Sequence, residues 1–177
     1  MLRSVVVLLV RESEYTCPMP PDLLPINSIR ELLEWYEQNL CAALHHDPRG
    51  YRVRFLPETF IHLIQLKTKY GAEPKNKRLA LDQIRSGRIQ FVAGRFDTQR
   101  TQELSWACEI ARNPDIICRN WQVLGTGAEA YVKNFGSNEE PQLRVMICKV
   151  VGTLREVITI FPRERIGDKE LLAKIWP

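Results

Sequence analysis

The fold is decided by four short segments, DIICRNWQ (Asp115–Gln122), EAYVKNF (Glu129–Phe135), QLRVMICKVV (Gln142–Val151) and REVITIF (Arg155–Phe161). Each is rich in β-branched and aromatic residues, and turn residues separate them, which is typical of antiparallel strands. The shortest gap, Gly152-Thr153 between two apolar runs, predicts a tight hairpin turn. The sequence therefore predicts a four-stranded antiparallel meander in this part of the chain.

The residues before the meander predict mainly helices. Apolar positions recur at helical spacing after Asn27 or Ser28, which are good caps, and that helix should end near Pro48. Further helices are expected over residues 60–67, 76–86 and 99–112, with a short strand over residues 51–55, and a closing helix over residues 169–175. The predicted fold class is α+β, with N-terminal helices, a four-stranded antiparallel meander sheet and a short C-terminal helix.

The domain organisation follows from the prolines near the N-terminus. Residues 12–25 contain Pro18, Pro20, Pro21 and Pro25, which predicts an extended linker. Before it, residues 4–10 predict either a strand or a buried helical segment, because periodicity does not separate the two. We therefore expect residues 1–50 to be an appendage with a proline-rich linker and one helix, and residues 51–177 to be the main domain.

Composition bears on the cellular location of the protein. The first apolar run ends at Arg11, which makes it too short for a signal-peptide core or a bilayer span. The five cysteines are scattered singly, which favours reduced thiols over disulfides or a zinc site. These features predict a cytoplasmic protein without a membrane partner.

Charge is distributed unevenly along the chain. Residues 1–48 hold three Lys/Arg against seven Asp/Glu, whereas residues 49–100 hold twelve against four. Because lysine and arginine neutralise phosphates, the basic middle is a candidate nucleic-acid footprint. The alternative is a solvated helix surface.

The motifs of several enzyme classes are missing from the sequence. It contains no GxxxxGK[ST], no GxGxxG after a strand, no HExxH and no GxSxG. The three histidines do not have metal-ligand spacing. We therefore expect no metal and no cofactor, and any chemistry should be general acid–base catalysis with electrostatic stabilisation.

A set of short motifs in a fixed order resembles one family. The chain contains RFLPETFIHLIQL, a basic helix ending in IRSGRI, then FDTQRTQELSWACEIARNPDII, AYVKNF and VITIFPRER. This order is similar to that of the phage and prophage nuclease-like proteins of the barnase–EndoU–colicin–RelE group, and the match covers residues 51–165. The resemblance implies helices before an antiparallel meander.

The resemblance also implies a function. It points to a metal-independent endoribonuclease of toxin or effector type that acts on tRNA or another structured RNA, with an immunity or antitoxin protein as a candidate partner. In that reaction the RNA 2′-hydroxyl attacks the adjacent phosphate while side chains transfer protons and stabilise the charge. The implied catalytic residues are His62, Arg100, Tyr131, Lys133 and Thr159, and the candidate RNA-binding residues are Lys75, Lys77, Arg78, Arg85, Arg163 and Arg165.

For three of these candidates the sequence also allows a purely structural role in place of the functional one. His62 is either an acid–base group or a histidine packed in the core. Arg100 lies in the first turn of a helix, where the dipole disfavours a cation, so it should face an anion such as phosphate or pair with Asp97. Thr159 is either a phosphate ligand or a residue chosen for its strand propensity.

Tyr131 and Lys133 fall on one face of the same strand. They either line an RNA-binding concavity or form an ordinary solvent face. Two other function classes also fit the sequence. The first is a catalytically inactive module of the same fold that binds RNA or a protein, and the second is an interaction protein whose acidic first segment docks on a basic neighbour.

Overall fold

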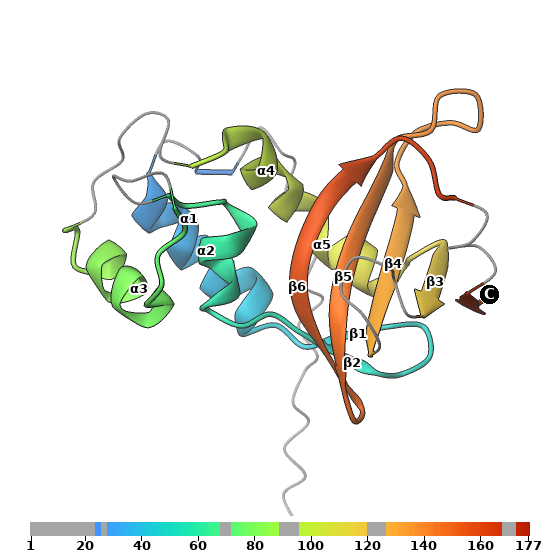
Figure 1. Cartoon of the computed structure of the whole chain (residues 1–177), viewed down its shortest axis with the longest axis horizontal. Helices are drawn as coiled ribbons and strands as arrows, with labels where there is room; N and C mark the ends of the chain where they lie inside the picture. Colours follow the sequence, from blue (N-terminus) through green and yellow to red (C-terminus); the bar gives the residue numbers. More distant parts are fainter. Residues whose placement is uncertain (1–23, 26–27, 68–71, 89–95, 120–126, 168–172) are drawn as a thin grey trace, which may run out of the picture.

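A set of helices lies beside a strongly curled sheet in the computed structural model (Figure 1). The structure describes residues 24–25, 28–67, 72–88, 96–119, 127–167 and 173–177. The helices are α1 (Ile29–Tyr36), η2 (Glu37–Cys41), α2 (Thr59–Leu63), α3 (Lys77–Arg85), α4 (Thr98–Gln102), η3 (Glu103–Trp106) and α5 (Ala107–Arg112). The strands are β1 (His45–His46), β2 (Arg52–Arg54), β3 (Ile116–Arg119), β4 (Ala128–Asn134), β5 (Leu143–Val151), β6 (Leu154–Arg163) and β7 (Lys174–Trp176).

The predicted fold class is wrong in its sheet and in its C-terminal element. The described residues form a seven-stranded sheet in the order β1-β2-β6-β5-β4-β3-β7, and it is mixed because β2 runs parallel to β6. Lys174 and Ile175, which were predicted to be helical, belong to β7, and this strand pairs with β3. Residues 169–172 of that predicted helix lie outside the described residues.

The four predicted strands are nevertheless present as the neighbours β3 to β6, each antiparallel to the next. The predicted tight turn is confirmed, because Val151 pairs with Leu154 across Gly152-Thr153. Gly152 has a φ of +58°, a conformation that glycine adopts without a Cβ penalty. The short strand expected over residues 51–55 is also present, as β2, but the sequence did not indicate that it joins the same sheet by pairing with the distant β6. Strands β1 and β7 were not predicted, because two or three residues show no periodicity.

Three of the helices begin with a side-chain cap, and their lengths differ from the predicted ones. Ser28, Asn76 and Asp97 each accept a hydrogen bond from a backbone N–H in the first turn of α1, α3 and α4. The single helix expected over residues 99–112 is divided into α4, the 3-10 turn η3 and α5. The segment expected over residues 4–10 and nearly all of the proline-rich segment lie outside the described residues.

Both faces of the sheet carry buried apolar side chains. The larger cluster joins α1, α2, α3 and α5 to one face, where Tyr131, Met146 and Ile160 are 0–1% exposed. Because helix α1 contributes to this same cluster, the first described helix packs with the elements that follow it. The other face buries mostly small side chains: Cys118, Ala128, Ala130, Val132, Val145 and Ile147.

A network of buried charges connects the loop between β1 and β2 to β4 and β6. Arg49 Nη2 lies 2.6 Å from Asp47 Oδ2 and 2.6 Å from Glu129 Oε2. On the other side of Glu129, Arg155 donates from Nε to Oε2 at 2.7 Å and from Nη2 to Oε1 at 3.2 Å. Glu129 therefore lies between two guanidinium groups contributed by different parts of the chain.

Two tyrosines complete this network. The Tyr131 hydroxyl donates to Asp47 Oδ2 at 2.8 Å and accepts from Arg49 Nη2 at 2.9 Å. The guanidinium of Arg155 stacks 4.0 Å from the ring centre of Tyr51, and that of Arg49 lies 5.0 Å from the same centre. Burial alone would raise the pKa of Glu129, but hydrogen bonds and charge from the two arginines hold it below its ordinary value.

Breaking this network should unfold the protein more easily. Glu129→Gln removes the charge that two buried guanidinium groups share, so we expect the free energy of unfolding to fall by about 3–5 kcal/mol. The matched change Glu34→Gln removes an exposed partner of Arg30 and should cost less than about 0.5 kcal/mol. Urea denaturation of both variants measures the difference, and equal costs would contradict the role of Glu129.

His45 of β1 is a second buried titratable group. Its side chain is inaccessible to solvent, and Nε2 lies 3.2 Å from the Leu40 carbonyl oxygen. Burial lowers the pKa of His45 from 6.5 to about 4, and the nearby charges of Arg112 and His46 act in the same direction. His45 is therefore neutral in the folded protein at neutral pH.

This neutral histidine predicts a pH dependence of stability. Below pH 6.5 the unfolded chain binds a proton at His45, whereas the folded chain does not do so until about pH 4. Stability should therefore fall as the pH falls through this window, by about 3 kcal/mol from this group. A His45→Gln variant should lose that part of the pH dependence of the unfolding free energy. His46→Gln, which changes the exposed neighbour, should keep it. Identical pH profiles for the parent and both variants would contradict the assignment.

Candidate functional site

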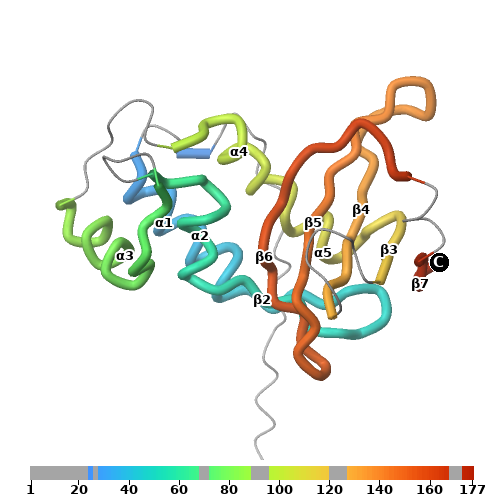
Figure 2. The backbone as a smooth tube through the Cα atoms, in the orientation of Figure 1, coloured from blue at the N-terminus to red at the C-terminus, as the bar shows by residue number. Residues whose placement is uncertain are grey.

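A pocket opens between α2, the start of α3 and strand β6. It has a volume of about 320 Å³ and is lined by Glu58, Thr59, His62, Lys77 and Ile158. Figure 2 shows α2 running beside β6, and the Thr59 hydroxyl donates to the Val157 carbonyl oxygen of that strand at 3.3 Å. This bond fixes α2 against the sheet, and His62 follows one turn later in the same helix.

His62 is held by an acidic residue from the segment before α3. Its Nδ1 lies 3.0 Å from Glu73 Oε2, and the other oxygen of Glu73 lies 2.7 Å from Lys77 Nζ. Burial alone would raise the pKa of Glu73, but hydrogen bonds from Lys77 and His62 lower it below its ordinary value. Glu73 is therefore a carboxylate that connects an imidazole to an ammonium group.

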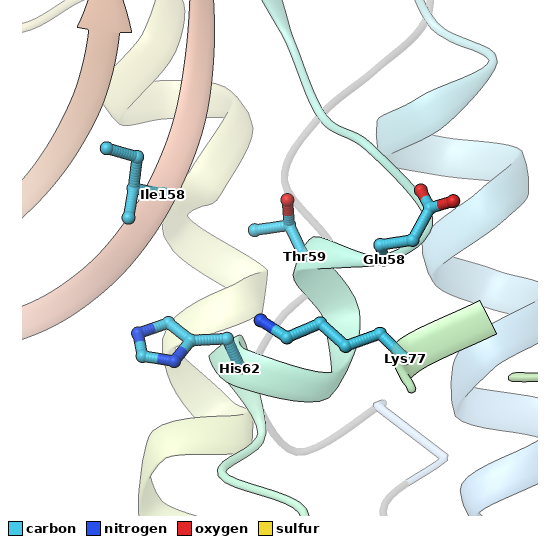
Figure 3. A pocket seen from close by; sticks show the side chains of 5 residues that line it. All are labelled: Glu58, Thr59, His62, Lys77 and Ile158. Carbon is cyan, nitrogen blue, oxygen red and sulfur yellow. The ribbon is translucent and has the colours of Figure 1, made fainter. Parts of the chain in front are cut away.

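The imidazole lies at the junction of two hollows. A second pocket of about 230 Å³ is lined by His62, Gln65, Leu66, Lys67 and Glu73. In Figure 3 the Lys77 ammonium lies near His62, while the carboxylate of Glu58 points away from both. The His62 side chain is 39% exposed, so a ligand in either pocket can reach it.

This arrangement suits proton transfer. With the proton on Nδ1, His62 donates a hydrogen bond to Glu73, and Nε2 is left to accept a proton from a ligand. A carboxylate behind an imidazole orients the ring and stabilises the imidazolium ion that forms. The neighbouring ammonium of Lys77 can bind an anion such as a phosphate.

The two predicted residues Arg100 and Thr159 contact each other rather than an open site. Arg100 Nη2 donates to Thr159 Oγ1 at 2.7 Å and to the Ile160 carbonyl oxygen at 3.0 Å. Asp97 instead caps the helix through the backbone N–H of Arg100. The Arg100 guanidinium therefore hydrogen-bonds to the edge of β6, as the Thr59 hydroxyl does at the Val157 carbonyl oxygen.

The other two predicted catalytic residues lie on the helix-covered face of the sheet. Tyr131 is 0% exposed and belongs to the buried charge network, and burial raises the pKa of its hydroxyl far above the ordinary value. The expected solvent-facing position of Tyr131 is therefore wrong. The Lys133 ammonium lies 2.9 Å from the carboxylate of Asp115 and 3.9 Å from that of Glu109 in α5. The strand alternation was correct, but α5 covers the face that these residues share.

The predicted RNA-binding residues do not form one stripe. Lys77 lines the first pocket, and Lys75 and Arg78 are exposed beside it on α3 and its approach. Arg85, at the other end of α3, pairs with Glu37 and Asp82. Arg163 is half-buried at the end of β6, and Arg165 is exposed after it. The structure thus brings together His62 and Lys77 from the predicted set.

Sequence reasoning missed Glu73 and Gln65. The spacing of Glu73 and Lys77 by four residues is a recognisable ion-pair signal, but Glu73 precedes the helix in which that rule applies. Its contact with His62 spans eleven residues and an interruption between two helices, so no local pattern indicates it. Gln65 lies in the terminal turn after α2, where its side-chain direction depends on the backbone conformation.

Three further findings complete the description of the molecule. The described residues contain no group of three or more His, Cys, Asp or Glu side chains that could hold a metal ion, and none of their helices is long and apolar enough to cross a membrane. The chain matches no protein-family model, and comparison with curated proteins and with solved structures gives no significant match.

The contact between Arg100 and Thr159 leads to a test of its structural role. Thr159→Val keeps the shape of the side chain but removes the acceptor of a half-buried guanidinium, so we expect a loss of about 1–3 kcal/mol in unfolding free energy. Thr98→Val changes an exposed threonine of α4 and should stay within about 0.5 kcal/mol of the parent. A thermal or urea denaturation series measures both, and a neutral Thr159→Val variant would contradict the edge-covering role.

Proposed function

We propose that this protein is a metal-independent endoribonuclease whose proton-transferring group is His62. The observation that carries the proposal is the His62–Glu73–Lys77 arrangement at the junction of two pockets. RNA is the substrate class because its 2′-hydroxyl supplies an internal nucleophile, so cleavage requires acid–base groups and a cation rather than a metal. The resemblance of the sequence to a nuclease group supports the same class.

Each side chain then has a defined part in the reaction. His62 Nε2 takes the proton of the 2′-hydroxyl as that oxygen attacks phosphorus, and the imidazolium gives a proton to the departing 5′-oxygen. Glu73 orients the ring through Nδ1. Lys77 stabilises the negative charge that gathers on the phosphorus oxygens. The products are a 2′,3′-cyclic phosphate and a free 5′-hydroxyl.

This assignment reduces the set of catalytic residues expected from the sequence. Arg100, Tyr131, Lys133 and Thr159 all have partners inside the protein, so their contribution to catalysis is indirect, through the position of β6 and β4. This activity fits a cytoplasmic toxin or effector that acts on tRNA. An immunity or antitoxin protein would then be its partner.

The second candidate is a module of the same fold that binds RNA or a protein without cleaving it. The same internal partners favour this candidate, because four of the five residues expected to be catalytic bind protein groups and line neither of the two pockets. Retention on RNA that falls steeply with salt, without any cleavage, distinguishes this module from the enzyme.

RNA cleavage in excess EDTA tests the proposal. Incubation with total RNA and with tRNA should give discrete fragments that end in 2′,3′-cyclic phosphate. His62→Ala should reduce the rate by about 10²- to 10⁴-fold, because it removes the general acid–base group. Lys77→Ala should also reduce the rate, since it removes the cation beside the phosphate.

Matched variants separate these effects from loss of folding. His46→Ala changes an exposed histidine of β1, and Lys149→Ala changes an exposed lysine of β5, so both should cleave at the parent rate. Intact RNA with the folded parent protein would contradict the enzyme. Full activity in His62→Ala would contradict the site.

A further inference from the structure

Gln65 has an unusual backbone conformation at the edge of the second pocket. Its φ is 51°, and it is the one non-glycine residue with a positive φ among the described residues. The turn that ends α2 explains this angle: the Gln65 N–H donates to the His62 carbonyl oxygen and the Leu66 N–H to the Ile61 carbonyl oxygen, both at 3.0 Å. This hydrogen-bond pattern is a Schellman cap, in which glycine is the usual residue at the left-handed position.

A glutamine here costs stability that a glycine would not. The left-handed conformation places Cβ close to the carbonyl oxygen, and glycine avoids that contact. The local fold therefore gives no reason for a long side chain at position 65. The reason must lie in what the amide can contact, and Gln65 lines the pocket of about 230 Å³ together with Lys67, Glu73 and His62.

The chemistry of the pocket lining indicates the kind of ligand. The Glu73 carboxylate is engaged by His62 and Lys77, so it is not the group that recognises a neutral ligand. Gln65 offers a donor and an acceptor side by side, and Lys67 is an exposed cation next to it. A nucleotide presents the complementary groups, which are the edge of its base and its phosphate.

We infer that this pocket binds one unpaired adenine of an RNA substrate, with the Gln65 amide on the edge of the base and Lys67 on an adjoining phosphate. Adenine presents an acceptor and a donor next to each other, N7 and N6, which match a glutamine amide. The base must be unpaired, because the grooves of a paired RNA helix hide this edge from side chains. This inference rests on the proposed function, and it makes Gln65 the residue that determines base preference beside the scissile phosphate at His62.

The test uses the full chain and short labelled oligouridylates that contain either one adenine or none. The parent should cleave beside the adenine between about fivefold and 100-fold faster than at any uridine. Gln65→Gly should lose this preference while its resistance to denaturation stays equal or rises, because glycine relieves the backbone. Gln65→Asn, which keeps an amide in a residue that tolerates this conformation, should keep part of the preference.

The control is Gln102→Ala, which changes an exposed glutamine of α4 and should behave as the parent. Cleavage without base preference in the parent, or an unchanged preference in Gln65→Gly, would overturn the inference and leave the proposed nuclease standing. If the parent cleaves none of these RNAs, the proposed nuclease fails, and equilibrium binding of the same oligonucleotides decides the inference. Tighter binding of the adenine-containing strand that Gln65→Gly loses would support it, and binding without base preference or no binding would overturn it.

Discussion

The carboxylate of Glu129, held between the guanidinium groups of Arg49 and Arg155, is the constraint on which the arrangement of the sheet depends. It joins the loop after β1 to β4 and β6, three parts of the chain that are far apart in sequence. Removal of one arginine would leave a buried negative charge uncompensated. The three parts of the chain must therefore assemble together. The short strands β1 and β2 have little pairing of their own and depend on this connection.

The position of the candidate site follows from that assembly. The network fixes Arg155 at the start of β6, and the same strand later accepts the hydroxyl of Thr59 and the guanidinium of Arg100 along its edge. Since Thr59 begins α2, these bonds set the place of His62 relative to the sheet. A proton-transferring side chain on a short helix gains its orientation from this support, and Glu73 fixes the ring itself.

The sequence predicted local features well and long-range ones poorly. The strand segments β3 to β6, the Gly152-Thr153 turn and the cap at Asp97 all follow from neighbouring residues, and the structure contains them. The strand at β2 was expected, but its pairing with the distant β6 was not, and β1 and β7 are too short to show a pattern, so a four-stranded sheet was expected where seven strands form. Alternation placed Tyr131 on the correct strand face, but which face α5 covers depends on tertiary packing. His62 was identified as a candidate, whereas Glu73 and Gln65 depend on how the chain turns after α2.

The most direct test of the central claim is a titration of the folded protein with an RNA dinucleotide whose 2′-hydroxyl at the scissile position is replaced by hydrogen. The readout is the NMR signals of the imidazole rings, and the chain has three histidines, so each ring can be assigned. A phosphate at the site should shift the ring signals of His62 and leave those of His45 and His46 in place. Shifts at His45 or His46 alone, or no shift at saturating dinucleotide, would contradict the account.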